Sequence, residues 1–150
     1  MRIRKIEHLG IACRSADEAA RFFGEALGLP VVARETLPEL GLKVVKLRTG
    51  ESVLELLEPL EGEEVVSRFL ASKGEGFHHV CFEVDDVRRA AEELRAKGYP
   101  PVWPEPRRGA GARWVNFLHP RNTFGVLVEL NEDAGAQAGD APEGPVQHFA

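Results

Sequence analysis

Residues 76–86 read GFHHVCFEVDD, an apolar strand-like run that carries a histidine and leads directly into a helix start. Near the N-terminus, residues 6–13 read IEHLGIAC and repeat this design. Further along, each copy is followed by a run with one carboxylate among aliphatic residues, VLELL at 53–57 and VLVEL at 126–130. Because self-similarity along a chain indicates repeated structural units, we expect two copies of one module.

Composition limits the classes of function. The 150 residues, of which 43% are hydrophobic, are enough for one domain with a substantial core. The formal net charge of −5 argues against a nucleic-acid partner, and no apolar run is long enough to span a bilayer. Cys13 and Cys81 both lie inside apolar runs, so no disulfide framework is expected and the cytoplasm is the expected compartment.

The first module is predicted to span residues 1–60 in the order β-α-β-β-β. Strands are expected at 3–13, 30–33, 42–47 and 53–57, with a helix between the first two. Ser15 and Glu18 have the spacing of a capping box at the start of that helix, and Gly28 is placed to end it.

The second module is predicted to span residues 76–131 in the same order. Its helix is expected to begin after Asp86 and to end at Gly98. We expect a weak strand at 101–103, a glycine-bearing loop at 107–112, and strands at 113–118 and 123–130. A helix at 63–72 is expected to bridge the modules within residues 61–75, and the tail 132–150 is expected to be mobile or to lie over a partner subunit.

Strand alternation predicts which side chains share a face. His8 lies on the side of Gly10 and Ala12, whose small side chains are expected to leave room for a ligand. His79 occupies the place of His8 in the repeat, so the adjacent His78 is expected to be a hydrogen-bonded structural residue. In all four strands the aliphatic face is expected to pack on helices, and the polar residue is expected to face a sheet cavity.

One histidine and one glutamate from each module therefore form a candidate metal site, namely His8, Glu55, His79 and Glu129. Two imidazoles and two carboxylates suit zinc, cobalt, nickel, manganese or iron. In octahedral geometry two positions would stay open for a bidentate substrate. The alternative is structural, because a strand histidine is often a satisfied core residue and a strand glutamate often faces solvent.

Six segments together resemble the vicinal oxygen chelate superfamily, which includes glyoxalase I and extradiol dioxygenases, and within it most resemble the methylmalonyl-CoA epimerases. The segments are HLGIA at 8–12, PELG at 38–41, ELLEPL at 55–60, GEGFHH at 74–79, FLHP at 117–120 and GVLVEL at 125–130. They cover nearly the whole chain except its tail.

The resemblance implies an α+β fold in which two βαβββ modules form a curved, mostly antiparallel, eight-stranded cup. It implies that His8, Glu55, His79 and Glu129 bind a divalent cobalt, nickel, manganese or zinc ion. The implied activity is epimerisation of methylmalonyl-CoA, by proton transfer at the carbon α to the thioester through a metal-stabilised enolate. The resemblance also implies a homodimer that acts on an acyl-CoA. The cytoplasmic setting and the lack of a nucleic-acid or membrane partner are expected from composition, as above.

Within this hypothesis Glu129 is the first candidate acid/base and Glu55 the second, although pure ligation by both remains an alternative. Backbone amides from Gly109 to Ala112 could bind the substrate carboxylate as an anion nest, with Gly109 and Gly111 as its glycines. Arg107, Arg108 and Arg113 could meet CoA phosphates. Some bacterial epimerases carry a glutamate, proposed as a base, where this chain has Val44.

Two other functions stay open. A glyoxalase I-type lactoylglutathione lyase would use the same ligands, although residues 119–122 read HPRN where glyoxalases usually carry a different turn. A non-enzymatic small-molecule-binding protein of the same superfamily would generally lack the metal ligands.

Overall fold

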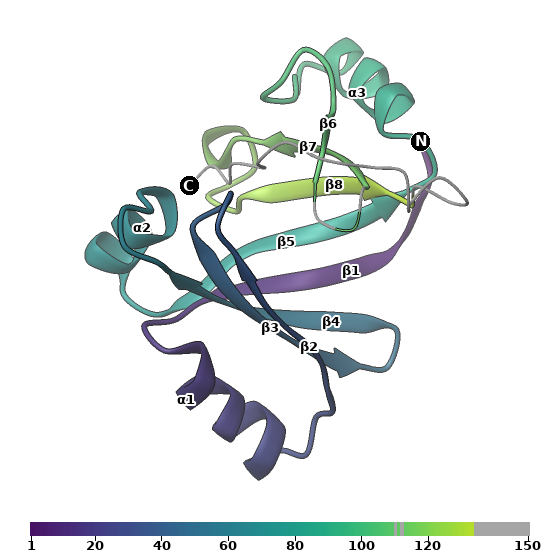
Figure 1. Ribbon diagram of the computed structural model, residues 1–150. Helices are drawn as coiled ribbons and strands as arrows, with labels where there is room; N and C mark the ends of the chain where they lie inside the picture. The colour runs from purple at the N-terminus through teal and green to yellow at the C-terminus, as the bar shows by residue number, and fades with distance from the viewer. Residues whose placement is uncertain (110, 112, 134–150) are drawn as a thin grey trace.

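The computed structural model describes residues 1–109, 111 and 113–133, and its eight strands form one sheet that curls into a half-barrel (Figure 1). The first half of the chain supplies β1 (Ile3–Ala12), β2 (Val31–Leu37), β3 (Leu42–Thr49) and β4 (Ser52–Pro59). The second half supplies β5 (Gly76–Val84), β6 (Arg107–Arg108), β7 (Trp114–Leu118) and β8 (Val128–Glu132). The predicted tail falls outside the described residues from 134 onward.

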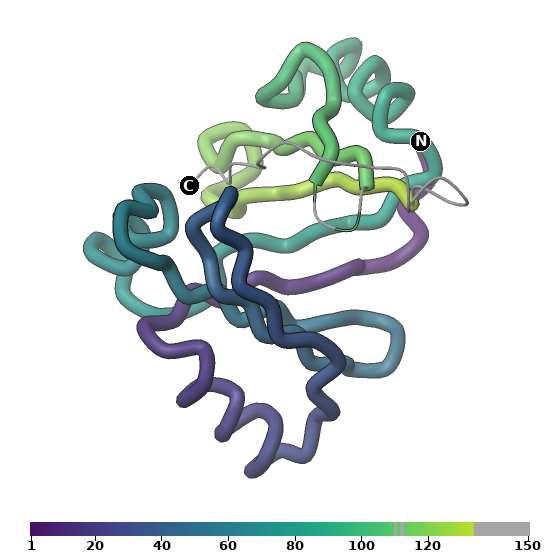
Figure 2. Tube along the Cα trace, in the orientation of Figure 1, coloured from purple at the N-terminus to yellow at the C-terminus, as the bar shows by residue number. Residues whose placement is uncertain are grey.

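The strand order is β2-β3-β4-β1-β5-β8-β7-β6, so each half contributes one continuous part of the sheet. Strands β1 and β4 pair in parallel, as do β5 and β8, and the other neighbours are antiparallel. The central strands β1 and β5, one from each half, lie side by side in the middle of the curl (Figure 2). The predicted α+β, mostly antiparallel, eight-stranded cup is confirmed.

Two helices cover the outside of the curl. Helix α1 (Ala16–Ala20) continues as a π-helix (Arg21–Ala26) and packs on β3 and β4 through Val45, Leu47 and Leu56. Helix α3 (Val87–Ala96) packs on Val84 and Leu130. The predicted starts are confirmed, because Ser15 and Asp86 each accept a hydrogen bond from the backbone N–H three residues later.

Helix α2 (Val65–Lys73) does not lie on the outer face of the cup with the other two helices. It covers one end of the cup. Its Val66, Phe69 and Leu70 pack against Ala12, Leu42, Val44 and Leu57. No helix in the described part of the chain is long and apolar enough to cross a membrane.

The second half differs from prediction at two segments. Residues 101–103 do not form a strand. Val102 donates to the carbonyl of Phe117, but Pro101 has no backbone N–H and the N–H of Trp103 donates to the side chain of Asn116, so the pairing does not continue. Strand β8 begins at Val128 instead of 123, because a 3₁₀ turn at Pro120–Asn122 and positive φ angles at Phe124 and Gly125 precede it.

The pairing between β1 and β5 contains register shifts beside both central histidines. Its Cα partners include Ile6–Phe82, His8–Cys81, Gly10–His79 and Ile11–Phe77. Glu7 is therefore an extra residue in β1, and His78 is an extra residue in β5. Such β-bulges disturb strict alternation and re-aim side chains, often next to functional sites.

Candidate metal centre and its cavity

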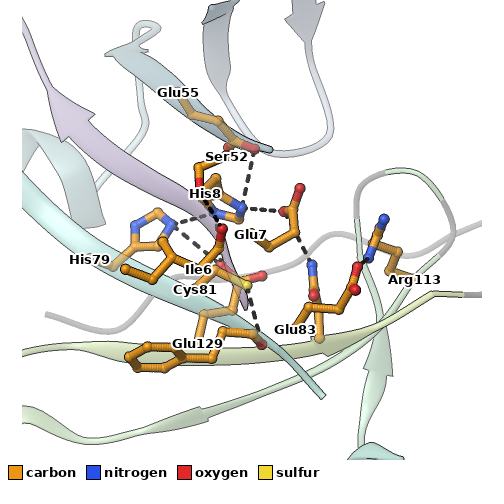
Figure 3. A network of polar contacts seen from close by, with 12 residues as sticks. Ile6, Glu7, His8, Ser52, Glu55, His79, Cys81, Glu83, Arg113 and Glu129 are labelled. Carbon is orange, nitrogen blue, oxygen red and sulfur yellow. Dashed lines mark hydrogen bonds and ion pairs between the residues drawn. The ribbon is translucent and has the colours of Figure 1, made fainter. Parts of the chain in front are cut away.

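Three ligand-type side chains from β1, β5 and β8, those of His8, His79 and Glu129, point toward one another (Figure 3). Nε2 of His8 lies 2.9 Å from Nε2 of His79, and each of these nitrogens lies 3.3 Å from Oε1 of Glu129. All three residues are buried. Ligands about 2.1 Å from an ion and at right angles to one another are about 3 Å apart, so the three atoms are spaced as neighbouring ligands would be.

The sheet register explains this convergence. His79 is the cross-strand partner of Gly10, while Glu129 is the partner of Cys81, which in turn pairs with His8. Residues that lie opposite each other on neighbouring strands project to the same face of the sheet. The curl then brings the side chains of this face together.

Glu129 is ionised, as a carboxylate that binds a metal cation must be. Burial by itself favours the neutral acid, but His8 and His79 outweigh it and hold the pKa of Glu129 well below its usual range. Burial also opposes a charged His8, but Glu55 and Glu129 raise the pKa of His8 well above its usual value. Among the described residues, Oε1 of Glu129 makes no hydrogen bond of normal geometry. A bound cation would satisfy this buried oxygen, so the donor set fits a metal ion.

Glu55 lies beside this group instead of inside it. Its Oε2 is 3.4 Å from Nδ1 of His8, the ring nitrogen opposite the one that faces His79 and Glu129. Of the four predicted ligands, the structure therefore brings three together and places Glu55 on the adjoining cavity wall.

The prediction that Gly10 and Ala12 leave room for a ligand beside His8 was wrong. A Cβ built on Gly10 would lie 2.2 Å from Cε1 of His79, so the imidazole of His79 fills that space. Ala12 is fully buried and packs with Leu57 and Phe69. Gly10 is required for the close approach of His79 to the strand, and the open space lies further toward β3 and β4.

That open space is a cavity of about 230 Å³ whose walls include His8, Glu55 and Glu129. Lys46 and Arg48 of β3 line it together with Arg113, so the walls carry cations as well as carboxylates. Neither Lys46 nor Arg48 forms an ion pair with another residue in the described ranges. Lys46 and Arg48 are therefore placed to bind an anionic group of a ligand.

In the part of the 109–113 loop that the structure describes, one amide of the predicted anion nest already donates to a backbone carbonyl. Gly111 and Arg113 line the cavity, but the N–H of Gly109 donates to the carbonyl of Arg113 at 2.7 Å. The guanidinium of Arg113 is half-buried and donates to Glu83 at 2.9 Å. The amide of Gly109 is thus engaged within the hairpin, and residues 110 and 112 lie outside the described residues.

Sequence reasoning missed Glu7, Lys46 and Asn131, which all line the cavity. Alternation could have identified two of them, because Asn131 is two residues after Glu129 and Lys46 is two residues after Val44. Glu7 could not be found in this way, since alternation places it opposite His8 and only the bulge brings it to the same side.

Known proteins resemble this chain over most of its length. A family model described as the Glyoxalase/Bleomycin resistance protein/Dioxygenase superfamily matches residues 7–117. The mitochondrial methylmalonyl-CoA epimerase of Homo sapiens is 37% identical over 85% of this chain and 73% of its own length. The ethylmalonyl-CoA/methylmalonyl-CoA epimerase of Cereibacter sphaeroides is 33% identical over 87% of this chain and 98% of its own length.

Solved structures show the same likeness. A variant of the Streptomyces coelicolor methylmalonyl-CoA epimerase, in complex with 2-nitronate-propionyl-CoA, is 36% identical and superposes with a TM-score of 0.80. The match covers 89% of this chain and all of that chain, 100%.

Proposed function

We propose that this chain, which belongs to the Glyoxalase/Bleomycin resistance protein/Dioxygenase superfamily, is a metal-dependent methylmalonyl-CoA epimerase. The observation that carries the proposal is the convergence of His8, His79 and Glu129 at a cavity that also contains Glu55. An epimerase must remove a proton from one face of a carbon and return one to the other face. It therefore needs proton-transfer groups on both sides of a substrate held at one place.

The cavity supports an acyl-CoA with a free carboxylate. About 230 Å³ is smaller than the roughly 300–1,000 Å³ of sites that enclose a drug-sized ligand, so the acyl group would fit inside and the rest of CoA would extend outward. Lys46, Arg48 and Arg113 supply positive charge for the malonyl carboxylate and the thioester region.

His8, His79 and Glu129 would hold the ion, with Glu55 as the expected fourth ligand. When bound, a divalent ion such as cobalt, nickel, manganese or zinc supplies Lewis-acid stabilisation of the charge that develops on the thioester oxygen, worth several kcal/mol. The side chains supply the proton transfers and the positioning.

Two carboxylates lie on opposite sides of the central strands. Glu129 stands on β8 and Glu55 on β4, with β1 and β5 between them. A substrate α-carbon above the central strands would have one carboxylate near each face. The lowered pKa keeps Glu129 ionised, so its carboxylate is able to accept the proton, although the same shift weakens it as a base. A well-positioned general base contributes roughly 10²–10⁴-fold to rate. Glu55 is our candidate for the second acid/base.

We further propose a cytoplasmic homodimer. Cys13 and Cys81 are both free and buried, which suits a reducing compartment. Ile6 and Phe77 of the central strands are exposed, as expected for a surface that a second subunit would cover. Size-exclusion chromatography with light scattering would measure the subunit number.

Isotope exchange tests the proposed reaction. The protein would be incubated in D₂O with methylmalonyl-CoA and each of the four metal ions in turn. We expect deuterium at the α-carbon together with inversion of configuration, both detected by NMR and by a stereospecific coupled assay. Absence of exchange with every ion would reject the epimerase, and turnover of methylglyoxal with glutathione would favour the glyoxalase-type alternative.

A further inference from the structure

We propose that Glu7 and His78, which occupy the bulges immediately before the two central histidines, are positioning residues for the metal centre. Each binds Nδ1 of the histidine that follows it, so that Nε2 is left to face the centre. The inference rests on the metal site of the proposed function and assigns these two residues a role in building it.

Glu7 sets the state of His8. Its Oε1 lies 2.5 Å from Nδ1 of His8 and also accepts a hydrogen bond from Nδ2 of Asn131 at 3.3 Å. An ionised carboxylate can only accept hydrogen bonds, so the proton of a neutral His8 must sit on Nδ1. The lone pair of Nε2 then points to His79 and Glu129, as a metal ligand requires.

His78 has the same relation to His79. The Nδ1 atoms of the two rings lie 3.0 Å apart, and both residues are buried. The ring of His78 also packs edge-on against Phe69 of α2, with ring centroids 5.0 Å apart. If Nδ1 of His79 donates to Nδ1 of His78, then Nε2 of His79 is also left with its lone pair toward the centre. Helix α2 thereby positions the ring of His78, which in turn orients the ring of His79.

The bulges make these contacts available. In a regular strand Glu7 and His78 would project to the face opposite their neighbouring histidines. An extra residue at each position places both side chains of the pair on the same side. One bulge lies in β1 and the other in β5. Both halves therefore place an acceptor beside Nδ1 of the histidine, and that acceptor is a carboxylate in the first half and an imidazole in the second.

The expected effect follows from metal sites in general. An outer partner on the second imidazole nitrogen fixes the tautomer and ring orientation, and its loss typically weakens metal binding by about 10–100-fold. We therefore expect Glu7→Leu and His78→Phe each to lower affinity for Co²⁺ within this range. Glu7→Gln should lose less, because its amide oxygen still accepts from Nδ1 of His8.

The test has two arms on the purified full-length chain. Calorimetric titration with Co²⁺ measures affinity. Long-range ¹⁵N NMR of the metal-free protein, recorded at a pH above the raised pKa of His8 so that the ring is neutral, reports which ring nitrogen of His8 and His79 carries the proton. Glu105→Gln is the matched control, because this carboxylate is exposed and its ion pair with Arg88 is remote from the cavity. The control should match the wild type in both arms.

Variants with wild-type tautomers and Co²⁺ affinity within twofold of the wild type would overturn the proposal. If the wild type binds no Co²⁺, the metal centre of the proposed function fails, whereas the tautomer arm still decides whether Glu7 and His78 set the ring states. If His78→Phe does not fold, Glu7→Leu and Glu7→Gln decide alone, since Glu7 is only partly buried. Equal losses in those two variants would contradict a role as hydrogen-bond acceptor.

Discussion

The two halves of the chain contribute the same kinds of side chain to the site but place them differently. The second half puts the carboxylate of Glu129 within 3.3 Å of both Nε2 atoms, whereas the first half leaves Glu55 beside Nδ1 of His8. The first half also supplies Lys46 and Arg48 from a long β2–β3 hairpin, while the matching strand β6 has only two residues. The repeated fold thus offers equivalent positions, and the two halves use them differently: Glu129 joins the group of candidate metal ligands, whereas Glu55 lines the adjoining cavity.

Glu129→Gln is expected to have the largest effect on this division of roles. The amide removes the ionised oxygen that lies against His8 and His79 and cannot act as a base. Deuterium exchange into methylmalonyl-CoA should fall by roughly 10²–10⁴-fold, and the residual rate should be measured at saturating metal. An exchange rate close to that of the wild type would assign Glu129 to ligation alone.

Gly10→Ala tests the junction between the halves. The new Cβ would lie 2.2 Å from Cε1 of His79, so this ring must leave the centre. We expect Co²⁺ affinity to fall by at least the ~10-fold that the loss of an outer partner costs, with circular dichroism unchanged. Gly24→Ala is the control, because its Cβ would meet its nearest neighbour at an ordinary 3.5 Å. Unaltered affinity in Gly10→Ala would show that His79 is not a ligand.

Glu55→Gln should be milder than Glu129→Gln. The amide keeps an oxygen on the cavity wall and removes a charge that lies 3.4 Å from Nδ1 of His8, on the side of the ring away from His79 and Glu129. We expect Co²⁺ affinity within about 10-fold of the wild type, the lower limit for losing an outer partner, and a larger loss of exchange if Glu55 is the second base. If Glu55→Gln binds metal more weakly than Glu129→Gln does, the inferred difference between the two halves is wrong.

Lys46→Met tests the cationic wall of the first half. Replacing the ammonium by a side chain of similar length should raise KM for methylmalonyl-CoA by up to ~10-fold, about 1.4 kcal/mol of binding, with a smaller change in kcat. Lys43→Met on the same strand is the control, because Lys43 faces outward and pairs with Asp17 at 2.7 Å. Equal effects of the two substitutions would point to general charge instead of a contact in the cavity.

The smallest expected effect concerns the turns before the last strand of each half. Gly50 has φ +66° in the first half, while Phe124 has φ +59° in the second and is 98% exposed. A left-handed residue that is not glycine costs roughly 1–2 kcal/mol, partly offset by the greater unfolded-state entropy of glycine. Phe124→Gly should therefore raise Tm by about 2 °C in thermal unfolding. A lower Tm would mean that Phe124 makes a stabilising contact.

Residue pattern alone predicted the repeat, the order of most elements and the four strands that carry His8, Glu55, His79 and Glu129. It succeeded because capping, alternation and glycine ends act over a few residues and are visible in any short window. The resemblance to a known superfamily then supplied the cup-like sheet and the expected acyl-CoA substrate.

Register was settled by tertiary structure. His8 and His79 are 71 residues apart, and the bulges that bring Glu7 and His78 beside them arise from pairing between strands that do not adjoin in sequence. The filling of the space above Gly10 and the offset of Glu55 likewise depend on where whole strands lie relative to one another. Alternation determines a side chain's face only while the pairing is regular, so a single extra residue reverses it.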